Sequence, residues 1–347
     1  ISINAPYATN SGRSAVEDKS SNDKVSTAIC DQLLPGFFEY LREIGGIDIA
    51  KYVPSIKNEL FLSYKTMRSI NLQDVITSIP LLKAYGVDSY VSFQNTRFIV
   101  FWSKNPAPLL PHLLQLQDRG IGCYVQFTLN DYVQNALEPH LPLLDQRIDT
   151  FKRLIDSLGQ GCVVWRFDPL LLCDTVSIDD LLNKIANIGN QLLGYTEKLV
   201  FSFADISSYR RVPINLQGNG IHYKEWDETS MIEFASRLTE MNSNRWGYTL
   251  ATCAESIDLE QFGIEHNRCI DPVLISKIKG DDKLLMDYLK SVKRDPGQRK
   301  ACGCIISKDI GSYNTCAHGC LYCYANTSPN CAAKNWQRHK PHTDSII

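Results

Sequence analysis

The sequence of 347 residues has no excess of charge of either sign and no long apolar segment. Its 36 Lys and Arg residues nearly balance its 38 Asp and Glu residues, which gives a formal net charge of −2. This balance excludes a general cationic attraction to nucleic acid or anionic lipid, although local basic patches stay open. No apolar run approaches the roughly 20 residues that a membrane-spanning helix needs, and no signal-peptide segment is visible near the start. We therefore expect a soluble, cytoplasmic protein without a membrane partner.

Motifs of several common enzyme classes are also missing. The chain has no G-x-G-x-x-G or Walker-type loop, which argues against binding of a dinucleotide or a nucleoside triphosphate. Its seven histidines show no H-E-x-x-H spacing, so a zinc enzyme of that type is not predicted. Ser202 lies in Phe-Ser-Phe without the flanking glycines of a nucleophile elbow. Other residues must carry any chemistry.

Cysteine, by contrast, is concentrated in one region. Six of the 12 cysteines lie between Cys302 and Cys331, while the other six are spread from Cys30 to Cys269. A secreted disulfide scaffold would have a higher share of cysteine and a more even spacing. In a reducing compartment, clustered thiols favour a metal or iron–sulfur site over disulfides.

From about residue 58, short apolar segments rich in β-branched and aromatic residues alternate with amphipathic ones. The strand candidates are Phe98–Trp102, Cys123–Phe127, Cys162–Phe167, Leu199–Phe203, Gly247–Thr252 and Cys304–Ile306, with weaker ones at Leu60–Ser63 and Tyr90–Phe93. Helical spacing covers Leu141–Leu158, Ile178–Leu193, Glu228–Met241 and Pro272–Ile278. Strands that are apolar on both faces and alternate with helices predict an α/β fold with a parallel sheet.

We expect this sheet to form a full or partial (β/α) barrel over residues 58–300. A helical or irregular segment, 1–57, would precede it, and a cluster-binding segment, 301–347, would complete it. An open doubly wound sheet is the alternative.

Polar residues follow or end several predicted strands. In parallel α/β barrels the carboxyl ends of the strands form the active-site face. The candidates at these ends are Lys104, Asn105, Gln126, Thr128, Arg166, Asp168 and Ser202. Arg166 and Asp168 are the most informative, because two opposite charges interrupt an apolar run. A structural ion pair is the alternative interpretation of these two.

The sharpest motif is C-x3-C-x2-C, formed by Cys316, Cys320 and Cys323. Soft thiolate ligands suit iron–sulfur chemistry, and three of them would leave one iron of a four-iron cluster open. The alternatives are a structural zinc site, which would need a fourth ligand such as His318 or Cys331, and an iron–sulfur site that only binds or relays electrons.

With Tyr322 directly before the third cysteine, this motif resembles the cluster motif of the radical S-adenosylmethionine (SAM) superfamily. The resemblance implies that the three cysteines bind a [4Fe–4S] cluster and that SAM chelates the open iron. One-electron reduction then yields methionine and a 5′-deoxyadenosyl radical, which abstracts hydrogen from a substrate that the sequence does not identify. The resemblance also implies an electron donor such as flavodoxin or ferredoxin. Because the motif follows the last predicted strand, we expect barrel closure to bring it to the mouth formed by the other strand ends.

Further segments resemble the DUF1848 family, a family of unknown function that has this motif near its C-terminus. These segments are Phe101-Trp-Ser-Lys-Asn-Pro, Gln126-Phe-Thr, Trp165-Arg-Phe-Asp-Pro, Cys253-Ala-Glu, Cys269-Ile-Asp-Pro and Ala301-Cys-Gly-Cys. The resemblance runs from about residue 95 to residue 326, and the N-terminal 60 residues depart from it.

A second cysteine set is predicted from the order of the strands. It consists of Cys253, Cys269, Cys302 and Cys304, which would meet at one edge of the barrel. Four thiolates complete the ligand set of an auxiliary iron–sulfur cluster. The alternative is that these cysteines are simply buried thiols, since cysteine is among the most buried residues.

The contacts to SAM are expected from the polar strand ends and the cluster loop. By charge complementarity, Lys104 or Arg166 would meet the carboxylate of SAM, and Asp168 or Asp205 its ammonium group or ribose. Tyr322 and Tyr324 would lie beside the cofactor. Basic segments around 209–211 and 290–300 make nucleic acid an alternative substrate class to a small molecule or peptide, although solvated loop charge is the better explanation of these segments.

Overall fold

The computed structural model describes residues 2–3, 79–82, 88–91 and 93–339. The chain divides into two compact units, one of residues 1–9 and 97–337 and the other of residues 10–96 and 338–347. In the second unit, β2 (Ile79–Leu82) and β3 (Asp88–Val91) pair as an antiparallel hairpin. The predicted strand Leu60–Ser63 and nearly all of segment 1–57 lie outside the described residues.

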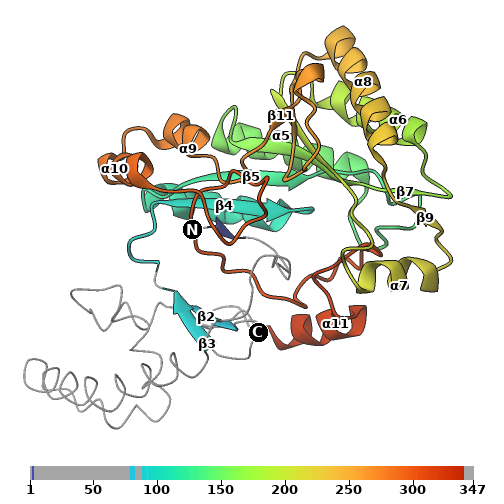
Figure 1. The fold of residues 1–347 in the computed structure, drawn as a ribbon. Helices are drawn as coiled ribbons and strands as arrows, with labels where there is room; N and C mark the ends of the chain where they lie inside the picture. Colours follow the sequence, from blue (N-terminus) through green and yellow to red (C-terminus); the bar gives the residue numbers. More distant parts are fainter. Residues whose placement is uncertain (1, 4–78, 83–87, 92, 340–347) are drawn as a thin grey trace, which may run out of the picture. The chain divides into compact units, whose positions relative to one another are not determined.

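The first unit is built on a seven-stranded parallel sheet (Figure 1). Its strand order is β1-β4-β5-β6-β8-β10-β11. The strands are β1 (Ser2–Ile3), β4 (Phe98–Ser103), β5 (Gly122–Thr128), β6 (Val163–Leu170), β8 (Lys198–Phe203), β10 (Thr249–Thr252) and β11 (Glu265–His266). From β4 onward the order in the sheet follows the order in the chain, so each crossover leads to the neighbouring strand. All carboxyl ends therefore lie at the same edge.

The predicted α/β class and parallel sheet are confirmed, but the described residues do not form a closed barrel. β1 and β11 remain the two edges of an open sheet. The prediction of a sheet strand at Cys304–Ile306 is wrong, because Ile305 forms only an isolated bridge with Arg294. The predicted strand Tyr90–Phe93 corresponds to β3, which pairs with β2 and not with the large sheet.

Three long helices cover one face of the sheet. They are α5 (Leu144–Leu158), α6 (Ile178–Leu192) and α8 (Glu228–Arg245), with α6 in contact with both of the others. α6 begins at a capping box formed by Ser177 and Asp180. Alternate strand residues such as Phe127, Trp165 and Phe201 are fully buried in the core on this side. The helices predicted here from periodicity are confirmed.

The other face of the sheet is covered by shorter pieces of chain. α9 (Pro272–Lys279) contacts β5, and α10 (Lys283–Ser291) contacts α9 (Figure 1). The period of two along the strands places Tyr124, Gln126 and Arg166 on this face. All three side chains are buried, so they contact other parts of the protein and not water.

The remaining short elements of the first unit lie in its connections. They are η2 (Ala107–His112), α4 (Leu113–Asp118), β7 (Leu172–Cys173), α7 (Arg211–Gly218), β9 (Tyr223–Lys224), η3 (Glu260–Phe262) and α11 (Pro329–Arg338). β7 and β9 pair antiparallel as a separate small ladder. Among the described helices, none combines the length and apolar character required to cross a bilayer.

A glycine in α6 permits close packing of the helix layer. A methyl group at Gly189 would lie 2.7 Å from Cζ2 of Trp246, and that ring is held by a 2.8 Å hydrogen bond to Asn190. We expect Gly189→Ala to lower the free energy of unfolding by about 1 kcal/mol, because overpacking costs about 1–3 kcal/mol and outweighs a helix-propensity gain of about 1 kcal/mol. Urea unfolding measures this.

The matched control is Gly218→Ala in α7, where a methyl group would meet nothing within 4 Å. This variant is expected to be as stable as the parent or slightly more stable. Equal effects of the two substitutions would contradict the packing argument.

Candidate functional site

The C-x3-C-x2-C loop is docked on the chain that follows β5. The backbone N–H of His140 donates to the carbonyl of His318 at 3.2 Å, and that of Leu321 donates to Leu137 at 2.9 Å. Gly319 lies between these contacts with a φ of 68°, and a Cβ there would lie 2.9 Å from Cδ2 of His140. Both the backbone conformation and the close approach require glycine at this position.

The loop is also closed on itself. The side chain of Asn326 donates to the carbonyl of Cys316 at 2.7 Å, and the N–H of Cys323 donates to the carbonyl of Cys320 at 3.0 Å. The second contact makes a tight turn around the second and third cysteines. The three thiols are therefore presented on a short loop with backbone hydrogen bonds on both sides.

The three thiols are near enough to influence one another electrostatically. Cys320 interacts with both Cys316 and Cys323, and Cys316 with Cys323. No hydrogen bond joins any two of these sulfur atoms, all of which are in the described part of the chain. Burial raises the pKa of Cys320 to about 12 and also raises that of Cys316. Both thiols therefore hold their protons at neutral pH, and a bound metal would have to displace them.

A buried ion pair lies directly beneath this loop. Lys104, which follows β4, donates to Oε1 of Glu138 at 2.9 Å and to the hydroxyl of Tyr322 at 2.9 Å. Tyr322 also donates to Glu138. The side chain of Glu138 is fully buried, whereas that of Lys104 is 19% exposed. This triad ties the cysteine loop to the carboxyl end of β4.

Two further buried residues extend this cluster. Nδ2 of Asn130, which follows β5, donates to the hydroxyl of Tyr322 at 3.3 Å, and Arg147 of α5 donates to the carbonyl of Asn130 at 2.7 Å. Among the described residues, Oε2 of Glu138 and Nε and Nη1 of Arg147 have no hydrogen-bond partner. Burial alone would raise the pKa of Glu138, but Lys104, the Tyr322 hydroxyl and Arg147 hold it below its usual value.

The second cysteine set gathers on the face of the sheet opposite the long helices. The Sγ atoms of Cys253 and Cys269 are 3.3 Å apart. Sγ of Cys304 accepts from the backbone N–H of Cys269 at 3.2 Å, and Cys302 is buried in the same apolar cluster. These contacts join cysteines that lie after β10, after β11 and after α10. We call Cys253, Cys269, Cys302 and Cys304 the four-cysteine cluster.

N–H groups surround two sulfur atoms of the four-cysteine cluster. Sγ of Cys269 accepts from Nη1 of Arg166 at 2.9 Å and from Nδ2 of Asn267 at 3.4 Å. Sγ of Cys304 accepts from the backbone N–H groups of Cys269 and Ile270 at 3.2 and 3.3 Å. Hydrogen bonds from Cys253 and Cys304, and then Arg166, lower the pKa of Cys269 well below its usual value. The surroundings of this sulfur favour a thiolate.

The four-cysteine cluster is not a closed tetrahedron. In the described part of the protein, no group of three or more His, Cys, Asp or Glu side chains is arranged to hold a metal ion as it stands. Binding of a metal by either cysteine set therefore requires side-chain movement.

A hydrogen-bonded path connects the two cysteine sets. Arg166 contacts Cys269 and pairs with Asp168, whose other carboxylate oxygen accepts from Ser202. The backbone N–H of Asp168 donates to Oδ1 of Asn130 at 3.0 Å, and Nδ2 of Asn130 donates to the carbonyl of Asp168 at 3.2 Å. Asn130 then reaches Tyr322. The strand ends of β5, β6 and β8 supply this path, and it runs between the two thiol clusters.

Comparison with known proteins places this constellation in a family. The model of the family described as "Domain of unknown function (DUF1848)" matches residues 67–325, which is more than half of the chain. The chain belongs to the DUF1848 family. The matched residues include both cysteine sets and the path between them. Among curated proteins and solved structures, the comparisons found no match.

In this DUF1848 protein, the residues predicted to contact SAM do not all lie free at the strand ends. Lys104 and Arg166 already have protein partners, Glu138 and Asp168. Gln126 donates to the carbonyl of Cys269 at 3.0 Å. Thr128 and Asn105 are half-buried, and the backbone N–H of Asn105 donates to Oγ of Ser103 at 3.0 Å.

The aromatic residues of the loop take two different positions. Tyr322 is buried in the polar cluster, whereas the ring of Tyr324 stacks on Tyr209 with centroids 4.9 Å apart. Arg299 donates to the hydroxyl of Tyr209, and Arg211 donates to the carbonyl of Thr327 at 2.5 Å. Two arginines of the basic segments therefore brace the cysteine loop and its surroundings.

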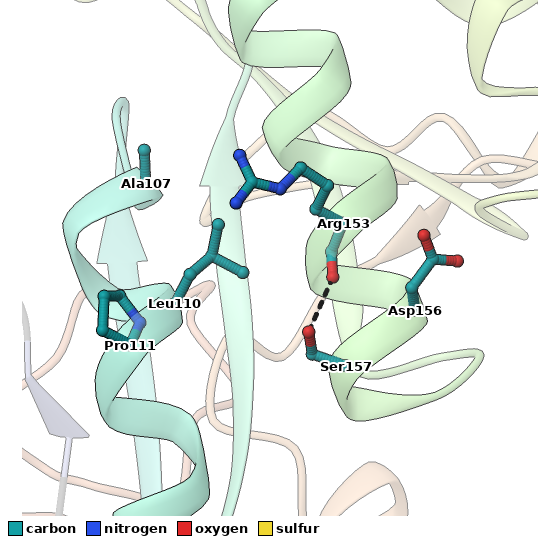
Figure 2. A pocket seen from close by; sticks show the side chains of 6 residues that line it. All are labelled: Ala107, Leu110, Pro111, Arg153, Asp156 and Ser157. Carbon is teal, nitrogen blue, oxygen red and sulfur yellow. Dashed lines mark hydrogen bonds between the residues drawn. The ribbon is translucent and has the colours of Figure 1, made fainter.

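Two described grooves are lined by residues outside both cysteine sets. An open groove of 620 Å³ is lined by residues of η2, of α5 and of the chain before them, and of the predicted site residues it includes Asn105. A neighbouring groove of 480 Å³ lies between Ala107, Leu110 and Pro111 on one side and Arg153, Asp156 and Ser157 on the other (Figure 2). Neither groove contains a cysteine, so we do not assign the cofactor site to them.

Sequence reasoning missed Glu138, Asn130 and Arg147. Glu138 and Asn130 lie in the irregular chain between β5 and α5, where no periodicity marks a buried position. Arg147 is a charged residue on an amphipathic helix, where exposure is the ordinary expectation. Contacts with Lys104 and Tyr322 reveal the role of Glu138 and Asn130, and the hydrogen bond to Asn130 reveals that of Arg147.

Asn130 offers a direct test of the polar path. We expect Asn130→Ala to lower the free energy of unfolding by about 2 kcal/mol, because the buried N–H and carbonyl of Asp168 would lose their partner. Urea unfolding measures the change. In the control Asn219→Ala, one exposed hydrogen bond to Asn215 is lost, and the expected cost is below about 1 kcal/mol. A small effect at Asn130 would show that water replaces its side chain.

Proposed function

We propose that this DUF1848 protein is a radical SAM enzyme with a substrate that is not yet identified. The observation that carries the proposal is the C-x3-C-x2-C loop, which presents three thiols and is tied through Tyr322 to residues at the carboxyl ends of parallel strands. In parallel α/β folds, ligands bind outside this edge of the sheet. The donor set fits a [4Fe–4S] cluster, since three soft thiolates leave one iron for a further ligand.

A bound [4Fe–4S] cluster would supply one-electron chemistry, with reduced flavodoxin or ferredoxin as the type of electron donor. This chemistry would be the reductive cleavage of SAM to methionine and a 5′-deoxyadenosyl radical, which would abstract a hydrogen atom from the substrate. The chain itself would hold and orient the groups. Cys316, Cys320 and Cys323 would be the ligands, and the burial of Cys320 would exclude water from one side of the site.

Lys104 is the cation best placed to meet the carboxylate of SAM. It is partly exposed, and its charge acts on both Cys316 and Cys320. Asp168, whose side chain is 25% exposed, is proposed to meet the ammonium group or ribose. Arg166 is buried and contacts Cys269, which favours a role in positioning Asp168 over direct contact with SAM.

The open sheet supports a partial barrel in which the cysteine loop lies at the mouth. The order β4-β5-β6-β8-β10-β11 winds in one direction, as in a barrel, whereas a doubly wound sheet reverses its order at a switch point. We propose that the C-terminal segment covers the gap where a closed barrel would have further strands.

Anaerobic reconstitution tests the proposed function. The full chain is loaded with iron and sulfide, reduced with dithionite and given SAM, and 5′-deoxyadenosine is measured by mass spectrometry. The expected result is formation of 5′-deoxyadenosine, together with a change in the electron paramagnetic resonance spectrum of the reduced cluster when SAM is added. The proposal would be contradicted if cluster-loaded protein yielded no 5′-deoxyadenosine with several reductants and its spectrum did not change when SAM was added.

A further inference from the structure

The two cysteine sets differ in the contacts between their sulfur atoms. No hydrogen bond joins any two sulfur atoms of the C-x3-C-x2-C loop, all of which are described. In the four-cysteine cluster, Sγ of Cys253 and Sγ of Cys269 are 3.3 Å apart, and Sγ of Cys304 accepts from the backbone N–H of Cys269 at 3.2 Å. This difference bears on the kind of metal centre that each set fits.

Sulfur spacing distinguishes a single ion from a cluster. In a tetrahedral zinc site the Zn–S distance of about 2.3 Å sets neighbouring sulfur atoms about 3.8 Å apart. In a four-iron cluster each cysteine binds a different iron, so the cluster core holds the cysteine sulfurs farther apart. The contact between Cys253 and Cys269 is close to the first spacing. The thiols of Cys302 and Cys304 would need to turn toward this pair to close the tetrahedron.

The surroundings of the four-cysteine cluster suit a buried thiolate centre. Zn²⁺ with four thiolates has a net charge of −2, which must be offset inside the protein. Arg166, whose side chain is 1% exposed, places its guanidinium 2.9 Å from Sγ of Cys269. The side chain of Asn267 and two backbone N–H groups donate to the sulfurs of Cys269 and Cys304. Such donors orient and stabilise thiolate ligands in metal sites.

We propose that Cys253, Cys269, Cys302 and Cys304 bind one tetrahedral Zn²⁺ ion. With four protein ligands the site is closed, which is the arrangement of a structural zinc. The ion would join the chain after β10 and β11 to the segment after α10, and so fasten the C-terminal part of the chain to the sheet. This inference does not depend on the proposed SAM chemistry, because it concerns a separate ligand set.

Metal analysis of a variant without the other cysteine set tests the inference. Cys316, Cys320 and Cys323 are replaced together by alanine in the full chain, so that any remaining metal belongs elsewhere. We expect about one zinc ion per chain. Exchange for Co²⁺ should give the strong thiolate charge-transfer absorption and the visible bands of a tetrahedral site. Both measurements leave the four proposed zinc ligands unchanged, so a loss of metal could not result from misfolding caused by a substitution at that site.

Single substitutions then assign the ligands. In the same background, Cys302→Ser is expected to weaken Co²⁺ binding strongly and to shift the spectrum, because one thiolate is lost. Cys162→Ser is the matched control, since Cys162 is a buried thiol of the same apolar cluster outside the ligand set. It is expected to retain the ion.

Three outcomes would overturn the inference. The first is a variant that holds neither zinc nor cobalt. The second is about four irons with sulfide per chain in place of zinc, which would instead establish the auxiliary iron–sulfur cluster predicted from the sequence. The third is a disulfide between Cys253 and Cys269 in protein purified without oxidants. The proposed function fails separately, through absence of 5′-deoxyadenosine from the unmodified protein.

Discussion

Replacement of Cys316, Cys320 and Cys323 together by alanine is expected to reduce 5′-deoxyadenosine formation to the background of the assay. The same variant should lose the absorbance of the [4Fe–4S] cluster after reconstitution, since no other described loop offers three thiols in this arrangement. The loop itself should stay in place. Its contacts to His140 and Leu137 are made by backbone groups, which alanine retains, and mass spectrometry with circular dichroism would compare activity and fold.

Cys331→Ala is the control for this experiment. Cys331 is a half-buried thiol in α11, in the same cysteine-rich region but outside the motif. Its replacement should leave both the cluster absorbance and 5′-deoxyadenosine formation intact. The ligand assignment would be wrong if the triple variant kept its activity, or if Cys331→Ala lost the cluster.

The parallel sheet was predictable from sequence because its strands are buried on both faces. Phe98–Trp102 is a continuous apolar run, and Cys123–Phe127 is apolar except for Gln126. The two segments correspond to β4 and β5 within one residue at either end. The same signal failed at Cys304–Ile306. A run of three apolar residues does not distinguish a strand from a buried loop, and here Cys304 and Ile305 are buried while their backbone pairs with 293–295 and Ile270.

The site was predictable in part, because strand order determines which loops meet. Cys253 and Cys269 follow neighbouring strands, so their proximity follows from the topology of a parallel sheet. The role of Lys104 was harder to predict, since its partners Glu138 and Tyr322 are 34 and 218 residues away in sequence. Charge at a strand end suggests a ligand contact, but sequence alone does not show whether another side chain already neutralises it.

Glu138→Gln is expected to have the largest effect on stability among single substitutions at the site. The substitution removes a fully buried charge that pairs with Lys104 and interacts with Arg147, which leaves buried positive charge without compensation. Breaking a buried pair in this way costs about 3–5 kcal/mol, and the lower value is expected because Lys104 is partly exposed. Urea unfolding at pH 7 measures the loss. Glu233→Gln is the control, since it breaks an exposed pair with Arg237 that is worth about 0.3–0.5 kcal/mol.

The pH dependence of the unfolding free energy distinguishes an effect of the charge of Glu138 from an effect of its packing. Lys104, Tyr322 and Arg147 outweigh the effect of burial and hold the pKa of Glu138 below its usual value. A carboxyl with a lowered pKa in the folded state stabilises the protein above its unfolded pKa of about 4.3, and this contribution is lost as the pH falls through the folded pKa. The difference in unfolding free energy between the parent and Glu138→Gln should therefore be largest at neutral pH and shrink on acidification. A difference that stays constant with pH would mean that the variant acts through packing, and that the ion pair does not hold the cysteine loop on the sheet.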